Sequence, residues 1–149
     1  MGKKYLICDS ARADWGKTET LLEVIEILNS PKKPHYKLIY EKPNTVKDKL
    51  CVFEGINELI AVSTLGDPNS QQADWLEEAA KTEAKIIVTA SRTKGSTINV
   101  VYDIARKYGY DILWFQNFHF DNSAFVGLPQ MRNIRMKEAE YIVGIIELL

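Results

Sequence analysis

The sequence predicts a single α/β domain, a three-layer sandwich with a mostly parallel sheet of about five strands. Short apolar runs alternate along the chain with stretches of helical periodicity, and this order is typical of a parallel sheet covered by helices. The length of 149 residues and the hydrophobic content of 46% suit one domain with a substantial core. We find no internal repeat, low-complexity segment or domain boundary between residues 1 and 149.

The first half of the chain is predicted to form one helix and four strands. The helix follows Lys17 with its apolar residues on one face, and the Asn-Ser-Pro sequence of residues 29–31 ends it. Residues 50–53 predict a short strand that is either antiparallel or at an edge of the sheet, whereas residues 58–64 predict a buried strand. The predicted strands are residues 4–8, 36–41, 50–53 and 58–64.

The second half of the chain is predicted to form three helices and two strands. Gly109 stands where the C-terminal cap of a helix is expected. The terminal helix has aligned apolar residues, which would face either the core or a dimer partner. The predicted helices are residues 71–83, 97–108 and about 135–149, and the predicted strands are residues 85–90 and 111–116.

A phosphate-binding pattern stands between the first strand and the first helix. Residues 11–18 read Ala-Arg-Ala-Asp-Trp-Gly-Lys-Thr, which matches G-x-x-x-x-G-K-S/T except that Ala11 replaces the first glycine. In such a loop the backbone N–H groups turn inward around a polyphosphate, and the helix adds the positive end of its dipole. Gly16 would adopt backbone angles that are barred to other residues. The sequence therefore predicts an anion-binding loop at this position.

This pattern resembles the P-loop nucleoside triphosphatase superfamily, and the resemblance covers roughly the first 28 residues and the order of elements behind them. It implies a P-loop NTPase-like fold that binds ATP or GTP with Mg²⁺. Lys17 would reach the β- and γ-phosphates, and the Thr18 hydroxyl would bind the metal. No N-K-x-D sequence indicates guanine, so ATP is the default ligand. The residues expected to contact the nucleotide are Arg12, Ala13, Asp14, Trp15, Gly16, Lys17, Thr18 and Glu19.

Ala11 leaves other interpretations of the loop open. The first glycine of such a loop often needs a positive φ, which alanine resists. The loop would then be degenerate, keeping the fold without binding a nucleotide. Alternatively, the Gly-Lys-Thr sequence occurs by chance at the start of a helix.

The acid that would hold Mg²⁺ is displaced from its usual position. In the usual arrangement an aspartate directly follows four apolar residues, but residues 59–62 are not followed by an acid. The first acid after them is Asp67, which we predict to be a metal ligand together with Thr18, although Asp-Pro is also common turn chemistry. Glu54 and Asp9 are weaker substitutes, and Asp9 could instead accept hydrogen bonds from the loop backbone.

A second polar loop also leads into a helix. Residues 91–97, Ser-Arg-Thr-Lys-Gly-Ser-Thr, combine cations, hydroxyls and a glycine at a helix N-terminus, which favours anion binding. Arg92 is predicted to be catalytic together with Lys17, because it could neutralise charge on a transferring phosphoryl group. It could equally grip a phosphorylated substrate. The alternative is a solvated loop in which Ser96 or Thr97 caps the helix.

Four loops are expected to share one edge of the sheet, because ligands of open α/β sheets bind outside the carboxyl ends of parallel strands. Besides the loop at residues 11–16 they are residues 65–70, 91–96 and 117–122. Three residues in or near these loops are weaker candidates. Arg12 could reach across a dimer, Trp15 could stack on a base, and His119 with the acid at position 121 could transfer protons, although aromatic residues there more often pack the loop.

Composition excludes several classes of function. The net charge of -1 gives no basic field for nucleic acid. No apolar run is long enough to span a bilayer, and we see no signal peptide, so a cytoplasmic protein is expected. Cys8 and Cys51 stand in strand patterns, which favours buried free thiols over a disulfide or a zinc site.

We therefore expect a small, single-domain P-loop protein that binds and hydrolyses a nucleoside triphosphate with Mg²⁺. One alternative is a small P-loop kinase that transfers the γ-phosphate to a small acceptor. Another is a non-catalytic switch or interaction module with a degenerate loop. A homodimer or a protein partner is compatible with each of them.

Overall fold

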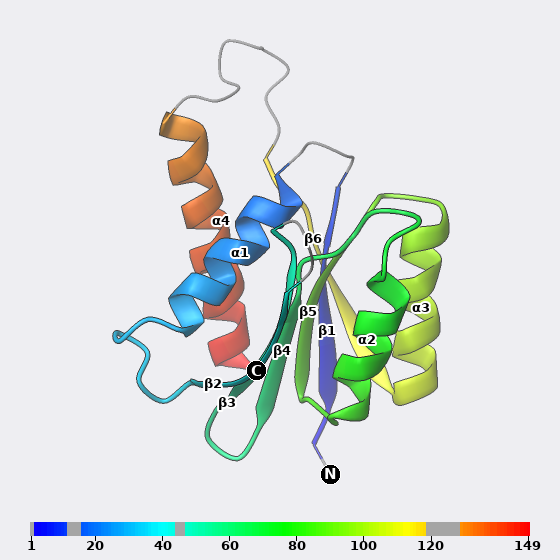
Figure 1. The fold of residues 1–149 in the computed structure, drawn as a ribbon, viewed down its shortest axis with the longest axis horizontal. Helices are drawn as coiled ribbons and strands as arrows, with labels where there is room; N and C mark the ends of the chain where they lie inside the picture. Colours follow the sequence, from blue (N-terminus) through cyan, green and yellow to red (C-terminus); the bar gives the residue numbers. More distant parts are fainter. Residues whose placement is uncertain (1, 12–15, 44–46, 119–128) are drawn as a thin grey trace.

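The computed structural model describes residues 2–11, 16–43, 47–118 and 129–149, with the side chains of residues 129 and 130 left out. Within these ranges six strands form one sheet in the order β2-β3-β4-β5-β1-β6 (Figure 1). The strands are β1 (Lys4–Ser10), β2 (Lys37–Pro43), β3 (Lys49–Glu54), β4 (Leu59–Ser63), β5 (Ile86–Ser91) and β6 (Tyr110–Phe115).

The sheet is mixed, which corrects the prediction of a mostly parallel sheet of about five strands. The four strands β4, β5, β1 and β6 are parallel neighbours, whereas β2 pairs antiparallel with β3 and β3 pairs antiparallel with β4. The short connections between β2, β3 and β4 explain this result, because a parallel pairing needs a crossover of about a dozen residues or more. The antiparallel alternative for residues 50–53 is confirmed, but β2 and not β3 forms the edge.

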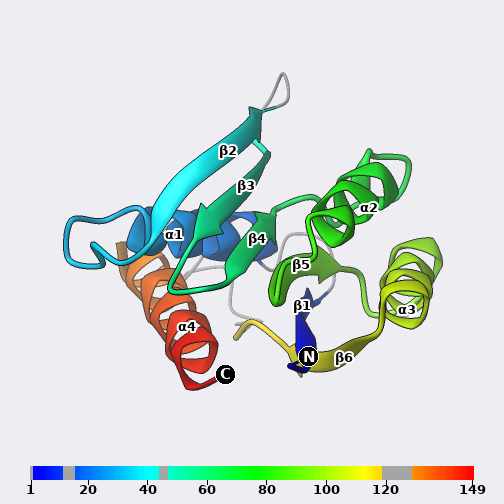
Figure 2. The same ribbon diagram turned by 90° about the horizontal axis from the view of Figure 1, so that it is seen from below.

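Four helices cover the two faces of the sheet, so the expected α/β sandwich is present. Helices α1 (Lys17–Leu28) and α4 (Pro129–Leu148) pack together on one face, and α2 (Gln72–Lys81) and α3 (Ser96–Tyr108) pack on the other (Figures 1 and 2).

Helix α4 begins at Pro129, earlier than the predicted start near residue 135. Proline is well tolerated in the first turn of a helix. The only apolar side chains that the next turn contributes to the packed face are Met131 and Ile134, which are half buried. The apolar periodicity that predicts the helix therefore begins later than the helix itself. Ile142 and Ile146 of α4 are each 1% exposed, which makes this apolar face part of the core.

The core has two layers because side chains alternate along each strand. On β1, Leu6 and Cys8 pack toward α2 and α3, while Ile7 packs toward α1 and α4. Cys8 and Cys51 are buried free thiols, as expected. In the part of the chain that the structure describes, none of the helices has both the length and the apolar character needed to cross a membrane.

Candidate functional site

The carboxyl ends of β1, β4, β5 and β6 meet at one edge of the sheet, so the four predicted loops begin there. At this edge the neighbouring strands β1 and β5 send their connections to opposite faces, β1 to α1 and β5 to α3 (Figure 1). Such a reversal opens a crevice where α/β sheets commonly bind ligands. The Ala11 N–H donates to the Ser91 carbonyl at 3.1 Å, which joins the two loops.

Gly16 and Lys17 give the first loop its shape. Gly16 is the N-cap of α1 and has φ 87° and ψ 20°, in the left-handed region that glycine adopts readily. Lys17 Nζ donates to the Ala11 carbonyl at 2.7 Å, and the Lys17 side chain is almost fully buried. The lysine therefore folds back from the start of the helix to the start of the loop. Residues 12–15 lie outside the described residues.

Ala11 does not have the backbone strain that its position suggested. It is fully buried and is not among the residues with a positive φ. An alanine therefore fits this position without the conformational freedom of glycine. The structure removes this particular reason for considering the loop degenerate.

The first turn of α1 faces the same edge. The first N–H groups of any α-helix lack partners within the helix, and they attract anions. Thr18 is half buried, while the Glu19 carboxylate accepts a hydrogen bond from Lys47 Nζ at 2.7 Å on the surface. Only the backbone of Glu19 is therefore suited to an anion.

Asp67 and Arg92 come together from the loops after β4 and β5. Arg92 Nη2 lies 3.4 Å from Asp67 Oδ1, and both side chains are partly exposed. The Arg92 N–H also donates to Thr97 Oγ1 at 2.9 Å. The N-cap of α3 is Gly95, which has no side-chain cap, so neither Ser96 nor Thr97 has the capping role considered above.

These charges also act on Lys17. Burial lowers the pKa of the Lys17 ammonium, and the carboxylates of Asp67 and Asp9 oppose this effect. The Arg92 guanidinium lowers that pKa further. The sequence assigned Lys17, Asp67 and Arg92 to one site. In the structure they are close enough to interact electrostatically.

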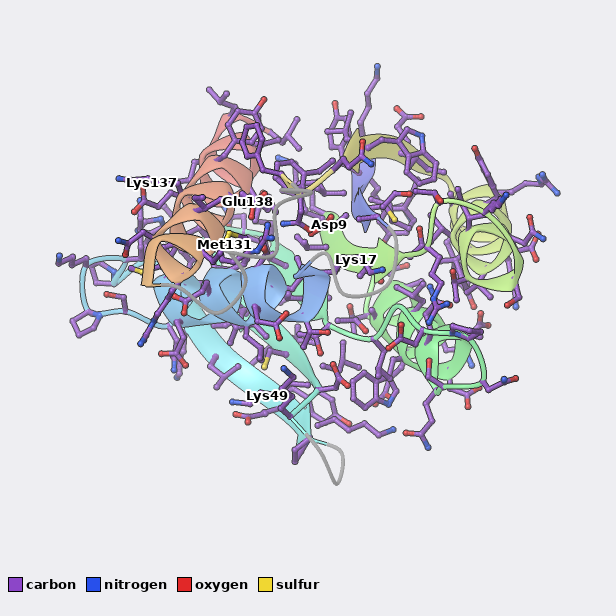
Figure 3. The ribbon with its side chains drawn as sticks, turned by 90° about the horizontal axis from the view of Figure 1, so that it is seen from above. Asp9, Lys17, Lys49, Met131, Lys137 and Glu138 are labelled. Carbon is purple, nitrogen blue, oxygen red and sulfur yellow. The ribbon has the colours of Figure 1, made fainter. Side chains whose placement is uncertain are left out.

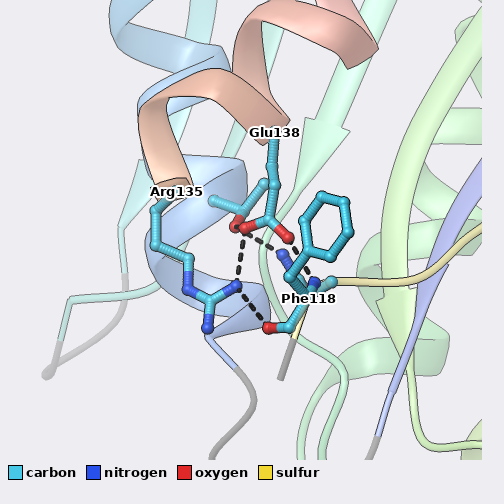
Figure 4. A network of polar contacts seen from close by, with 5 residues as sticks. Phe118, Arg135 and Glu138 are labelled. Carbon is cyan, nitrogen blue, oxygen red and sulfur yellow. Dashed lines mark hydrogen bonds and ion pairs between the residues drawn. The ribbon is translucent and has the colours of Figure 1, made fainter. Parts of the chain in front are cut away.

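A buried polar network that sequence reasoning did not predict lies beside the loop (Figure 4). Glu138 accepts hydrogen bonds from Arg135 Nη1 at 2.6 Å, from the Phe118 N–H at 2.6 Å and from Thr20 Oγ1 at 3.4 Å. Arg135 Nη1 also donates to the Phe118 carbonyl at 3.1 Å, and Asn117 Nδ2 donates to Thr20 Oγ1 at 2.7 Å. The network connects the end of β6 and helix α4 to the first turn of α1.

The sequence contains only a weak signal for this network. Arg135 and Glu138 are spaced i, i+3 on α4, but this spacing is also common on exposed helix faces. Their partners come from α1 and from the segment after β6, so only the tertiary fold brings them together.

Asp9 is the most unusual residue of the site. Its side chain is fully buried, and neither carboxyl oxygen has a hydrogen-bond partner among the described residues. The pKa of Asp9 is raised to about 8, first by burial and then by the negative charge of Glu138, while the positive charges of Lys17 and Arg135 act in the opposite direction. Figure 3 looks onto this edge and shows Asp9 beside Lys17. Asp9 accepts no hydrogen bond from Ala11 or Gly16. The other backbone groups of this loop, in residues 12–15, lie outside the described residues.

Other predicted residues remain untested. Arg12, Trp15, His119, Asp121 and Asn122 lie outside the described residues, and so do Ala13 and Asp14. Among the described residues, His, Cys, Asp and Glu form no group of three or more that could hold a metal ion.

The chain matches no family model, and comparisons with curated proteins and with solved structures also gave no match.

Proposed function

We propose that this protein binds a nucleoside triphosphate with Mg²⁺ at the N-terminus of α1 and hydrolyses it. The observation that carries the proposal is the conformation of Gly16 and Lys17. A left-handed glycine begins the helix, and the next residue directs a buried amine back across the loop to Ala11. Such a loop can enclose a phosphate chain with backbone N–H groups and one lysine.

Lys17 would exchange its bond to the Ala11 carbonyl for phosphate oxygens. In the bond to Ala11 only the donor is charged, whereas in a bond to phosphate the donor and the acceptor carry opposite charges, so the exchange favours the bound state. The backbone of residues 12–19 would surround the phosphates. Arg92 would leave Asp67 and neutralise charge that develops on the γ-phosphate during hydrolysis.

Mg²⁺ would be held by the Thr18 hydroxyl and by one acid of this edge, for which the sequence proposes Asp67. Magnesium commonly binds through one or two protein ligands, substrate phosphates and water, so it needs no cluster of three acids. ATP remains the default nucleotide because no guanine-specific sequence is present.

A non-catalytic switch is the alternative that one observation favours. Lys17 and Arg92 both contact groups of their own chain, Ala11 and Asp67, in this structure. A bound triphosphate would displace both contacts and change how the loops after β1, β4 and β5 are connected. The same loops could then signal to a homodimer or protein partner without any hydrolysis. The kinase alternative requires an added acceptor.

A phosphate-release assay with excess MgATP or MgGTP tests this proposal. We expect slow release by the wild type, at least 100-fold slower release by Lys17→Met, and unchanged release by Lys81→Ala, an exposed lysine on α2. Phosphate transfer only in the presence of an acceptor would favour the kinase. Tight nucleotide binding without release or transfer would favour the switch.

A further inference from the structure

Asp9 is a buried carboxyl group that has no role in the proposed function. It is the last acid of β1, it is 0% exposed, and both of its carboxyl oxygens lack a hydrogen-bond partner among the described residues. Buried polar groups without partners are rare, because they lose hydration and gain nothing in return. A cation, or a hydrogen-bond donor supplied by a ligand, would satisfy such a buried acceptor.

The charged groups around Asp9 are engaged elsewhere. From α4, Arg135 binds Glu138 and the Phe118 carbonyl, while Glu138 uses both of its oxygens. From α1, Lys17 binds the Ala11 carbonyl. These groups surround Asp9 electrostatically, but none of them makes a hydrogen bond with it.

Another buried oxygen without a partner lies on the neighbouring strand end. Asn117 Oδ1 is buried and has no hydrogen-bond partner among the described residues. Asp9 is in register with Phe115, the last residue of β6, and Asn117 follows two residues later. The amide of Asn117 donates to Thr20 on α1, which places it on the same face of the sheet as Lys17. The edge between β1 and β6 therefore offers oxygen acceptors on the side where α1 begins.

We propose that Asp9 is the acidic ligand, direct or through one water, of the divalent cation that accompanies the nucleotide. This inference rests on the proposed function, and it assigns to Asp9 the role that the sequence gave to Asp67. Asp9 lies on the strand that leads into the loop, next to Lys17 in Figure 3. Asp67 lies in the loop after β4, two strands away from β1. It is paired with Arg92 and is more exposed than Asp9.

The test separates the metal step from the nucleotide step. Binding of a non-hydrolysable ATP analogue is first measured in EDTA, and Mn²⁺ is then titrated into the protein–analogue complex and followed by electron paramagnetic resonance. Asp9→Asn keeps the volume of the side chain, Asp67→Asn tests the competing assignment, and Asp74→Asn, an exposed acid on α2, is the control. Circular dichroism and thermal melting verify that each variant folds.

We expect Asp9→Asn to weaken Mn²⁺ binding to the complex at least tenfold and to keep analogue binding in EDTA. For Asp67→Asn we expect a smaller loss of Mn²⁺ affinity than for Asp9→Asn, and for Asp74→Asn we expect no loss. Mn²⁺ affinity in Asp9→Asn within twofold of the wild type would overturn this inference while leaving the proposed function intact. Absence of analogue binding by the wild type, with and without metal, would overturn both.

Discussion

The guanidinium of Arg135 lies directly against the backbone of Gly16. A Cβ atom added to Gly16 would come within 2.3 Å of Arg135 Nε and 2.8 Å of Arg135 Cζ. Helix α4 therefore closes over the point where the loop after β1 becomes helix α1. Gly16 meets two requirements at once, a positive φ and the close approach of a buried arginine.

Gly16→Ala is expected to lower the free energy of unfolding by about 2 kcal/mol or more, because the left-handed backbone is strained for alanine and Arg135 must move. Urea unfolding measures the change. Gly144→Ala is the matched control, since an added Cβ there meets no atom within 4 Å and alanine favours the helix. Equal stability of Gly16→Ala and the wild type would show that neither requirement holds.

Glu138→Gln is expected to destabilise the fold by roughly 3 kcal/mol, because it leaves the buried Arg135 charge without its partner. The control is Glu140→Gln, whose ion pair with Lys137 is exposed and should contribute no more than about 0.5 kcal/mol. Thermal or urea unfolding of the two variants compares a buried with an exposed pair on the same helix. Similar losses in both would contradict the buried network.

The raised pKa of Asp9 predicts a specific dependence of stability on pH. The folded state holds a proton up to about pH 8, whereas an unfolded aspartate releases it near pH 3.8, so stability falls as the pH rises between these values. Relative to Asp9→Asn, the wild type should lose roughly 3 kcal/mol between pH 5.5 and pH 8.5. Urea unfolding of both proteins at the two pH values measures this difference. A constant difference would show that Asp9 is ionised throughout.

Arg92→Ala is expected to leave stability within about 0.5 kcal/mol of the wild type, because its pair with Asp67 is exposed. If Arg92 neutralises charge in the transition state, phosphate release should fall about 1,000-fold while nucleotide binding changes far less. Single-turnover phosphate release and analogue binding separate the two effects. Arg106→Ala, an exposed arginine on α3, serves as the control. A loss of affinity without a loss of rate would instead assign Arg92 to substrate binding.

The sequence predicted the elements of the fold better than their pairing. Apolar periodicity located every strand and helix of the described chain within a few residues, except for the start of α4. The sequence left an antiparallel strand at residues 50–53 open, but the mostly parallel prediction missed the antiparallel meander of β2, β3 and β4, although the short connections between these strands favour it. The left-handed conformation of Gly16 follows from a local pattern and was therefore predictable.

The buried surroundings of the site were not predictable in the same way. Glu138, Arg135 and Asn117 come from segments that only the fold brings next to α1. Asp9 was noticed in the sequence, but its complete burial and its lack of partners depend on the packing of α1 and α4 above β1. A single sequence does not contain these distances.

The central claim is that the loop before α1 binds a nucleoside triphosphate through Lys17. Calorimetric titration of the wild type and of Lys17→Ala with a non-hydrolysable ATP analogue and Mg²⁺, repeated with the GTP analogue, tests it most directly. The account predicts saturable binding by the wild type and at least a 100-fold loss of affinity in the variant, with the fold intact by circular dichroism. Equal binding by both proteins, or no binding of either analogue by the wild type, would contradict it.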